Sequence, residues 1–599
     1  MNKTELYNKI VQLDGLTNEE KSELLGLLRK QKKYGLVWED KPEDVEERLR
    51  DELPVLIEDT TKTIISSEAD APNHILIEGD NLEALTTLAY THEGKIDVIY
   101  IDPPYNTGNK DFVYNDRIVD KEDSYRHSKW LSFMNKRLRI AKQLQSDRGV
   151  IFISIDDNEQ AQLKLLCDDV FGERNFVGLI SRATGTTTGQ DTGSLGKACD
   201  YMLVYSRREN YIIGGLPLDE KDLGRYSMSD EKGKFSILQL RRTGGEDRRE
   251  DRPTMFFPII APDGTEIYPY GPTGYESRWR VSPQKVKSML ADNLLYFKKD
   301  KNNEWKVYYK FYSENKTKRP SNLWTEIEGN KKAQIELKNI LHNKLFETPK
   351  PIDLIRRILQ ITDSDSSIIL DFFAGSGTTL HATMQLNAED GGHRKCILVT
   401  NNENNICEEV TYERNKRVIN GYTTPKGEEV AGLKNNTLRY YRTSFVGRSR
   451  SMKNMRQLMN LSTDMLCIKE DLYTEQTKFG EQPTYKNVFR YFDDGKKRMM
   501  IIYKEEAVPL LADLIRNTNY EGKMRVYVFS PSEDPWEGEF EEVADKVQLC
   551  ALPQAIYNAY KRILPKKKDI TLEQENDAAS NDDKAFNGML NFDEKEDEQ

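Results

Sequence analysis

A short polar run, Asp102-Pro103-Pro104-Tyr105, carries the clearest chemical signal, and it directly follows the apolar segment Val98–Ile101. A carboxylate and a neighbouring carbonyl can each accept one N–H of an amine, so Asp102 and Pro103 could hold an amine in plane and free its lone pair. The two prolines fix φ and remove backbone donors, which would present that carbonyl rigidly. Tyr105 offers an aromatic face to a planar ligand. We take these four residues as catalytic candidates; the alternative is a plain turn with an N-capping aspartate.

A glycine-rich turn follows much later, since Asp371 lies 269 positions after Asp102 and opens the run DFFAGSGTT. Glycines between a strand and a helix allow a ligand to approach the backbone closely. The run lacks GxGxxG spacing, and no lysine follows Gly377 as it would in a phosphate-binding loop. An aspartate here favours a ligand with an ammonium group over a pyrophosphate. The candidate cofactor contacts are Asp371, Phe372, Ala374, Gly375, Gly377 and Thr378.

Together and in this order, the two runs resemble the motifs of the β-class DNA amino-methyltransferases. In that family the catalytic motif precedes the cofactor motif, and a target-recognition domain lies between them. The resemblance implies methyl transfer from S-adenosylmethionine to an exocyclic amine in double-stranded DNA, with the base flipped out and stacked on Tyr105. The DPPY form implies N6 of adenine rather than N4 of cytosine.

Two further segments match this family. The first, Ile75–Leu82, contains Asp80, which the resemblance places beside the target base. We assign Asn106, directly after the catalytic run, as the second contact to the base. The other segment, Phe346–Pro351, implies that Thr348 and Lys350 help to hold the methionine part of the cofactor. No metal site is expected.

A fuller resemblance is to the Mod subunit of type III restriction–modification systems, which Tyr34–Glu39 and Asn401–Asn405 both match. It implies a homodimer that recognises DNA and works with a separate helicase and nuclease subunit, Res. In related enzymes an acidic residue after the second cofactor strand binds the ribose hydroxyls. Asn401, Asn402 and Glu403 compete for this place, and Glu403 is our candidate.

Three functions remain open: a type III modification subunit, a solitary methyltransferase of adenine or cytosine N4, and a DNA-binding specificity protein with a degenerated catalytic motif. The intact DPPY run and glycine-rich turn count against the third. The sequence has no Pro-Cys dipeptide, which carries the nucleophile of a cytosine-C5 enzyme. It also has no GKS or GKT run of an ATPase.

The elements around these motifs are short apolar strands that alternate with helices. We expect strands at His74–Glu78, Ile96–Ile101, Val150–Ile155, Tyr201–Tyr205, Ile368–Asp371 and Cys396–Thr400, and helices at Leu131–Leu144 and Gln160–Val170. This alternation predicts an α/β fold with a doubly wound, mostly parallel, Rossmann-like sheet covered on both faces. Ligands bind at the carboxyl ends of the strands in such sheets, so both motifs should meet at one edge.

The alternation also divides the chain. We expect an N-terminal helical region (1–60, with a capping box at Thr17 and Glu20), a catalytic half (61–213), a target-recognition domain (214–345), a cofactor half (346–445), an α+β C-terminal domain for dimer or partner contacts (446–572), and an acidic disordered tail (573–599). The tail carries a net charge of −8 out of −11, so the body is nearly neutral. Six cysteines without CxxC spacing, and no apolar run of about 18 residues, predict a cytoplasmic protein.

The predicted target-recognition domain is rich in aromatic and basic residues. Tyr296–Arg319 holds eight Lys/Arg, three Asp/Glu and seven aromatic residues, a composition that suits phosphate contact and base stacking. The alternative is a β-hairpin with a solvated face and an aromatic row toward its core. The candidate DNA contacts are Arg241, Arg242, Arg278 and Lys310.

Overall fold

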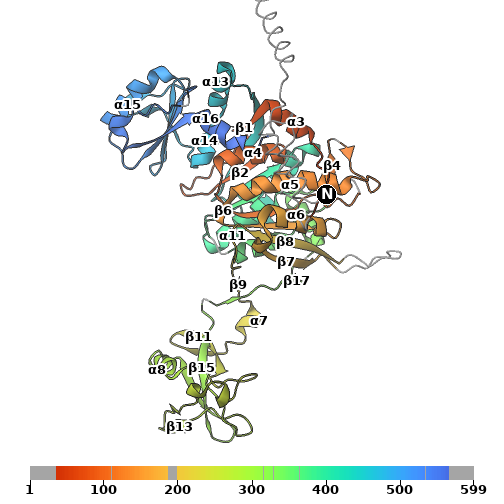
Figure 1. Cartoon of the computed structure of the whole chain (residues 1–599), viewed down its shortest axis with the longest axis vertical. Coiled ribbons are helices and arrows are strands. Elements are labelled where there is room, and N and C mark those ends of the chain that lie inside the picture. Colours follow the sequence, from red (N-terminus) through yellow and green to blue (C-terminus); the bar gives the residue numbers. More distant parts are fainter. Residues whose placement is uncertain are drawn as a thin grey trace, which may run out of the picture. The chain divides into compact units, whose positions relative to one another are not determined.

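The computed structural model describes residues 36–564, except 109–110, 116, 186–197, 315, 328, 363–364 and 533. The chain divides into two compact units (Figure 1). The smaller unit is Ile213–Ser321, and the larger one contains the rest of the described chain. The expected capping box at Thr17 and the acidic tail 573–599 lie outside the described residues.

A ten-stranded sheet forms the centre of the larger unit. Its order is β1 (Glu52–Glu58), β22 (Thr437–Gly447), β2 (Asn73–Glu78), β19 (Lys395–Thr400), β18 (Ile368–Asp371), β3 (Ile96–Ile101), β6 (Gln145–Ile155), β8 (Cys199–Ser206), β7 (Phe176–Ala183) and β17 (Leu323–Trp324). The strands from β22 to β6 are mutually parallel. The pairs β1–β22, β6–β8 and β7–β8 are antiparallel. The predicted α/β fold and all six predicted strands are confirmed.

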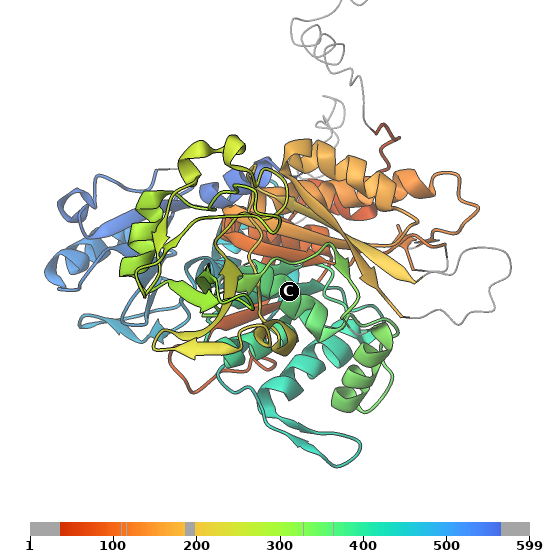
Figure 2. The same ribbon diagram turned by 90° about the horizontal axis from the view of Figure 1, so that it is seen from below.

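Helices cover both faces of this sheet (Figure 2). One layer contains α4 (Asn81–Thr91), α5 (Arg126–Leu144) and α6 (Gln160–Phe171), whose apolar residues share one core with alternate residues of the central strands. The other layer contains α10 (Ile352–Ile361), α11 (Thr378–Asp390) and α12 (Glu413–Asn420). Strands buried on both faces therefore read as continuous apolar runs, which made them recognisable in the sequence.

The start of the described chain differs from the prediction of a helical region up to residue 60. Only α3 (Asp44–Asp51) is helical there, and the next seven residues form the edge strand β1, paired antiparallel with β22. Pro54 lies within β1, and an edge strand tolerates the missing N–H. The run ELPVLIE has four consecutive buried residues and lies against the core, so it extends the sheet.

The smaller unit has its own core under a four-stranded antiparallel sheet. The sheet order is β10 (Met228–Asp230), β11 (Gly233–Gln239), β15 (Trp305–Tyr312) and β14 (Leu295–Lys299). Helix α8 (Pro283–Ala291) contributes Val286 and Met289 to this core. The predicted boundary at residue 345 is too late, because β17 pairs with β7 of the large sheet and α9 (Asn330–Leu341) contacts α12. A two-residue strand leaves no recognisable pattern.

The C-terminal region is an α+β subdomain that packs on the large sheet's helical layer. Its five strands are β23 (Glu475–Gln476), β26 (Phe489–Asp493), β27 (Arg498–Ile502), β28 (Met524–Phe529) and β29 (Val547–Leu552), with α15 (Val508–Asn517) against one face. Helices α14 (Thr463–Glu470) and α16 (Gln554–Lys561) contact α4, and α13 (Met452–Leu461) contacts β22.

Minor elements complete the fold: α7 (Glu220–Leu223) and the ribbons β4–β5 (Val113–Tyr114, Arg117–Ile118), β9–β16 (Leu216–Pro217, Thr317–Lys318), β12–β13 (Ile259–Ile260, Glu266–Ile267), β20–β21 (Tyr422–Thr423, Glu429–Val430) and β24–β25 (Lys478–Phe479, Gln482–Pro483). Among the helices that the structure describes, none has the length and apolar character that crossing a membrane requires.

A buried histidine connects three segments of the core. His74 of β2 accepts a hydrogen bond at Nδ1 from the Cys396 amide (3.1 Å) and contacts the Asn436 side chain through Nε2 (2.9 Å). Burial lowers the pKa of His74 to about 4. The folded state therefore holds this ring neutral at a pH where the unfolded chain, with a pKa of about 6.5, binds a proton.

We expect the free energy of unfolding to fall as the pH drops from 6.5 to 4, with His74 contributing roughly 3 kcal/mol of that loss. A glutamine side chain is neutral at every pH, so His74→Gln should make the free energy of unfolding depend less steeply on pH. The buried His92 and His381 would still contribute to that dependence. Urea denaturation across this pH range measures the effect, and the exposed His393→Gln is the control. An unchanged slope in His74→Gln would contradict the assignment.

Candidate active site

The two predicted motifs meet at the carboxyl edge of the large sheet. Strand β18 lies parallel to β3, with Ile369 opposite Val98 and Leu370 opposite Ile99, so the loops that follow the two strands are neighbours. They line a cavity of about 640 Å³, within the range of small-molecule sites. Of the predicted residues, its lining includes Asp102, Pro103, Pro104, Tyr105, Thr348, Lys350, Asp371, Ala374, Gly375 and Thr378.

Asp102 belongs to a closed three-membered contact. Its Oδ1 accepts hydrogen bonds from the Tyr105 hydroxyl (2.9 Å) and from Lys350 Nζ (2.7 Å), and Lys350 also donates to the Tyr105 hydroxyl (2.8 Å). Burial and the Asp102 carboxylate raise the pKa of Tyr105 well above its usual value, so the phenol keeps its proton. These bonds fix the tyrosine ring and engage Oδ1 rather than Oδ2. The contact between Lys350 and Asp102 was not predicted from the sequence.

The backbone of the catalytic loop is held from behind by a tryptophan. Trp130 of α5 is fully buried, and its Nε1 donates to the Pro104 carbonyl at 2.7 Å. That oxygen therefore already accepts one hydrogen bond, and the Pro103 carbonyl remains our candidate acceptor for the amine. Sequence analysis missed Trp130, because an aromatic residue on the apolar stripe of a helix looks like ordinary core.

The glycine-rich turn is shaped by its own buried groups. Asp371 is 3% exposed, and it accepts bonds from the Phe373 amide (3.0 Å) and the Thr379 hydroxyl (2.5 Å). Burial raises the pKa of Asp371 to about 7. Gly377 has a φ of 70°, and a Cβ there would lie 2.5 Å from Asn415 Nδ2. The glycine is thus required by the chain's own packing, whereas the sequence suggested only room for a ligand.

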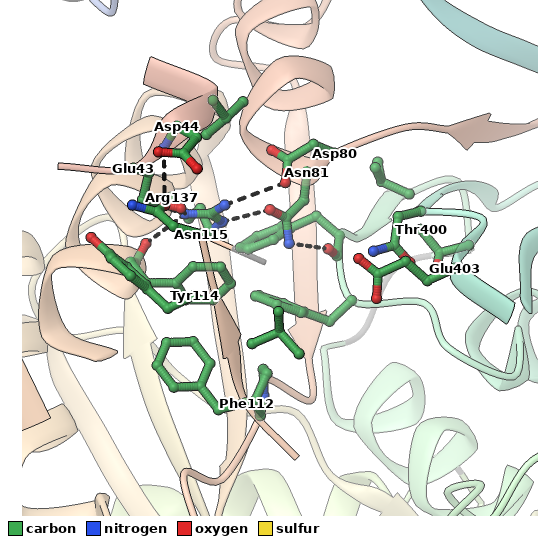
Figure 3. A pocket seen from close by; sticks show the side chains of 18 of the residues that line it. Glu43, Asp44, Asp80, Asn81, Phe112, Tyr114, Asn115, Arg137, Thr400 and Glu403 are labelled. Atoms are coloured by element: carbon green, nitrogen blue, oxygen red, sulfur yellow. Dashed lines mark hydrogen bonds and ion pairs between the residues drawn. The ribbon is translucent and has the colours of Figure 1, made fainter. Parts of the chain in front are cut away.

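A second cavity, of about 340 Å³, adjoins the first, since the two share Pro104, Asp111, Phe373 and Thr400 in their linings. Figure 3 shows how Arg137 organises it. This guanidinium is 1% exposed, donates to both oxygens of Glu43 (2.9 and 3.0 Å), and also donates to the Asn81 side chain. Asn81 in turn donates to the Phe372 carbonyl at 3.1 Å. The chain of contacts connects α3 with the glycine-rich turn.

Asp80 and Glu403 both line this smaller cavity. Asp80 caps α4 by accepting from the Leu82 amide (2.7 Å), and it is not among the residues that line the larger cavity with Tyr105. Of the residues that compete with Glu403, Asn401 lines the same cavity, whereas Asn402 accepts from the Glu408 amide. The structure thus groups Asp80, predicted to be near the base, with the candidate ribose contact.

Asn106 also differs from its predicted place. Its side chain is buried behind the catalytic loop, where Nδ2 donates to Glu159 Oε1 at 2.5 Å. The larger cavity has instead Asp200 and Asn330 in its wall, and Arg182 Nε donates to Asp200 Oδ1 at 2.9 Å. These residues lie at the ends of two strands and at the start of a helix. Only the tertiary structure brings them together, so the sequence did not reveal them.

The basic residues chosen as DNA contacts are mostly engaged within the smaller unit. Arg241 and Arg278 are buried, and they donate to the carbonyls of Arg242 (3.0 Å) and Glu246 (2.6 Å). Lys310 donates to Asp230 at 2.7 Å. These cations stabilise the unit's loops, and its exposed cations lie elsewhere; they include Arg248, Arg249, Arg252, Lys298 and Lys299.

The chain is similar to known DNA methylases. A family model described as DNA methylase (N6_N4_Mtase) matches residues 96–420. The Mod subunit of the type III restriction–modification enzyme EcoPI from Escherichia phage P1 is 36% identical over 391 residues, which is 58% of this chain and 60% of that protein. The type II methyltransferase M.KpnI of Klebsiella pneumoniae is 35% identical over 60% of this chain and 87% of its own length.

A solved structure also aligns with this chain. The DNA modification methylase of Thermus thermophilus in complex with S-adenosyl-L-methionine aligns over 57% of this chain and 94% of its own, with 14% identity and a TM-score of 0.28. The present chain spans 55–60% of the length of the EcoPI and StyLTI Mod subunits that it matches.

We expect Gly377→Ala to destabilise the fold by more than the roughly 1–2 kcal/mol that a side chain costs in a left-handed conformation. The added carbon would meet Asn415 Nδ2, so the buried Asn415 side chain or the turn would have to move. Gly391→Ala is the matched control, because Gly391 has a φ of 73° at the other end of α11 and open space around it. Denaturant unfolding compares them, and equal losses would show that the Asn415 contact is unimportant.

Proposed function

Because this chain belongs to the DNA methylase family, we propose that it transfers a methyl group from S-adenosylmethionine to N6 of adenine at a specific site in double-stranded DNA. We further propose that it is the modification and recognition subunit of a type III restriction–modification system. The observation that supports this most is the meeting of Asp102-Pro103 and the glycine-rich turn in one cavity. A carboxylate and a rigid carbonyl beside a cofactor loop can hold an amine that accepts the methyl group.

The adjoining cavities fit the cofactor in size and in charge. The smaller one has carboxylates at Asp80 and Glu403 for hydroxyl or amine donors and the aromatic residues Phe372 and Phe373 for a purine ring. The larger one offers Thr348, Lys350 and Gly375 to an amino-acid end. Bound across them, the cofactor would supply an electrophilic methyl group on its sulfonium. We therefore propose that Asp80 contacts the adenosyl part of the cofactor and not the target base.

Asp102 and Pro103 hold the target amine. Asp102 Oδ2 and the Pro103 carbonyl each accept one N–H, which keeps the nitrogen lone pair directed at the methyl group. As the nitrogen gains the methyl group it becomes positively charged, and the Asp102 carboxylate stabilises that charge inside a partly desolvated cavity. Asp102 Oδ2 can then accept the N–H proton that the methylated nitrogen must lose and pass it to solvent. Tyr105, fixed by its bond to Asp102, stacks on the flipped base. Lys350 positions Asp102 by donating to its Oδ1, and it lines the same cavity, where it can contact the amino-acid end of the cofactor.

Two contexts for this activity compete. Similarity to the EcoPI Mod subunit favours a type III system with a Res partner and two copies of this chain. Similarity to M.KpnI favours a methyltransferase without a type III partner, and M.KpnI is matched over more of its length. We prefer the first because two further type III Mod subunits, StyLTI and EcoP15I, match at 33% and 30% identity. The C-terminal subdomain, remote from the chemistry, is our candidate for dimer or partner contacts.

Sequencing that detects modified bases in DNA from a host expressing this chain tests the function. We expect N6-methyladenine at one recurring sequence. Asp102→Asn should lower turnover on the order of 10²–10³-fold, because it removes the charge that stabilises the amine in the transition state. Calorimetry should show that cofactor binding is retained. The exposed Asp120→Asn is the control, and near-normal turnover by Asp102→Asn would refute the assignment.

A second test separates the two contexts. The purified chain should methylate its site with S-adenosylmethionine alone. We expect no ATP hydrolysis, because its glycine-rich turn provides no phosphate-binding lysine. We expect no DNA cleavage, because the described residues contain no carboxylate cluster that could hold a nuclease's metal ion. A partner with helicase motifs should add both activities when mixed with it. Cleavage by the chain alone, or no effect of any such partner encoded beside it, would contradict the type III proposal.

A further inference from the structure

The catalytic loop ends in a backbone conformation that needs support. Asn106, the residue after Tyr105, has a φ of 57°, in the left-handed region that asparagine tolerates better than most residues. Its side chain is 1% exposed, so its amide cannot be satisfied by water. Nδ2 donates to Glu159 Oε1 (2.5 Å) and to the Arg126 carbonyl (3.3 Å). The direction in which the chain leaves Tyr105 thus depends on this side chain's partners.

Glu159 is a fully buried carboxyl group immediately before α6. Its Oε1 contacts two groups: Asn106 Nδ2 and His127 Nδ1, the latter at 2.6 Å. Arg126 Nε donates to His127 Nε2 at 3.1 Å, so that nitrogen is an acceptor and the ring's proton lies on Nδ1. Both neighbours therefore donate to Oε1, so a proton bound to this carboxyl group would lie on Oε2.

The other oxygens of the pair are buried and lack a partner among the described residues. These atoms are Glu159 Oε2 and Asn106 Oδ1, and they belong to the two side chains that already share a hydrogen bond. A proton on Oε2 would turn one of them into a donor for the other, and the orphaned acceptors would form a second bond. Two parallel bonds between a carboxylic acid and an amide would then close a ring.

The surroundings favour that proton. Burial raises the pKa of Glu159 to about 8, and the Asp156 carboxylate adds to the effect, while the Asn106 bond and Arg126 oppose it. His127 is neutral in this arrangement, because burial and Arg126 lower its pKa. The acid form is therefore the main form of Glu159 at neutral pH.

We propose that Glu159 is a positioning residue whose protonated carboxyl pairs with the Asn106 amide and holds the Asp102–Tyr105 loop in its reactive shape. It acts from behind the loop, through Asn106, and does not touch the reacting atoms. This proposal deepens the proposed methyl transfer and rests on it. Above the pH at which Glu159 ionises, Oε2 has no proton to donate to Asn106 Oδ1, and the loop loses that support.

Glu159→Gln tests the proposal, because a glutamine amide offers the same acceptor and donor as the protonated acid at every pH. We expect wild-type kcat to fall as the pH rises above 8 while Glu159→Gln keeps its kcat within about twofold of its neutral value. Glu159→Ala should lower kcat on the order of 10- to 100-fold through misplacement of the loop, with unchanged cofactor affinity. Glu122→Gln makes the same chemical change at an exposed position and should behave as wild type.

Thermal unfolding gives a readout without catalysis. A carboxyl whose pKa is raised by folding contributes stability that is present below the unfolded value of 4.5 and is lost as the pH approaches 8. The Tm of wild type should therefore fall over this range relative to that of Glu159→Gln. Parallel Tm curves, or a Glu159→Gln that is as slow as Glu159→Ala, would overturn the proposal. Absence of methylation by the wild type would instead refute the proposed function, and the Tm comparison would still judge the acid–amide pair.

Discussion

The parallel pairing of β18 with β3 is the constraint on which the site depends. Neighbouring parallel strands end at the same edge of a sheet, so residues 269 positions apart in sequence become adjacent. The register also decides how far each carboxylate extends. Asp371 is one position beyond the paired Leu370, whereas Asp102 is three beyond the paired Ile99. Asp371 stays within the sheet's edge and is 3% exposed, while the Asp102 side chain is 24% exposed on its loop.

Because Asp371 is more deeply buried than Asp102, the two aspartates have different roles. Asp371 is desolvated, and its oxygens accept from the glycine-rich turn that they shape. Asp102 lies beside the ammonium of Lys350, and one of its oxygens remains outside that contact. The arrangement of the acids is thus a property of strand register more than of local sequence.

What the sequence predicted well has a local cause. DPPY and the glycine-rich turn were recognisable because their chemistry and conformation are encoded in consecutive residues, and strands such as Ile96–Ile101 because both of their faces are buried. The roles that differed from the prediction depend on partners far away in the chain. Asn106 needs Glu159, Asp102 needs Lys350, and Arg278 is engaged by a carbonyl of its own unit. No window of sequence contains both members of these pairs.

Helix α5 shows how such distant partners are coordinated. His127, Trp130 and Arg137 are three and seven positions apart, so they lie along one side of the helix. Their contacts reach Glu159 behind Asn106, the Pro104 carbonyl, and Glu43 with Asn81, respectively. One rigid helix therefore supports the catalytic loop from behind and also positions residues that line the smaller cavity. The partners lie on separate elements: Glu159 and Pro104 follow β6 and β3, whereas Glu43 and Asn81 lie at the N-terminal ends of α3 and α4. A helix that supplies none of the proposed catalytic residues thus fixes the geometry in which the chemistry takes place.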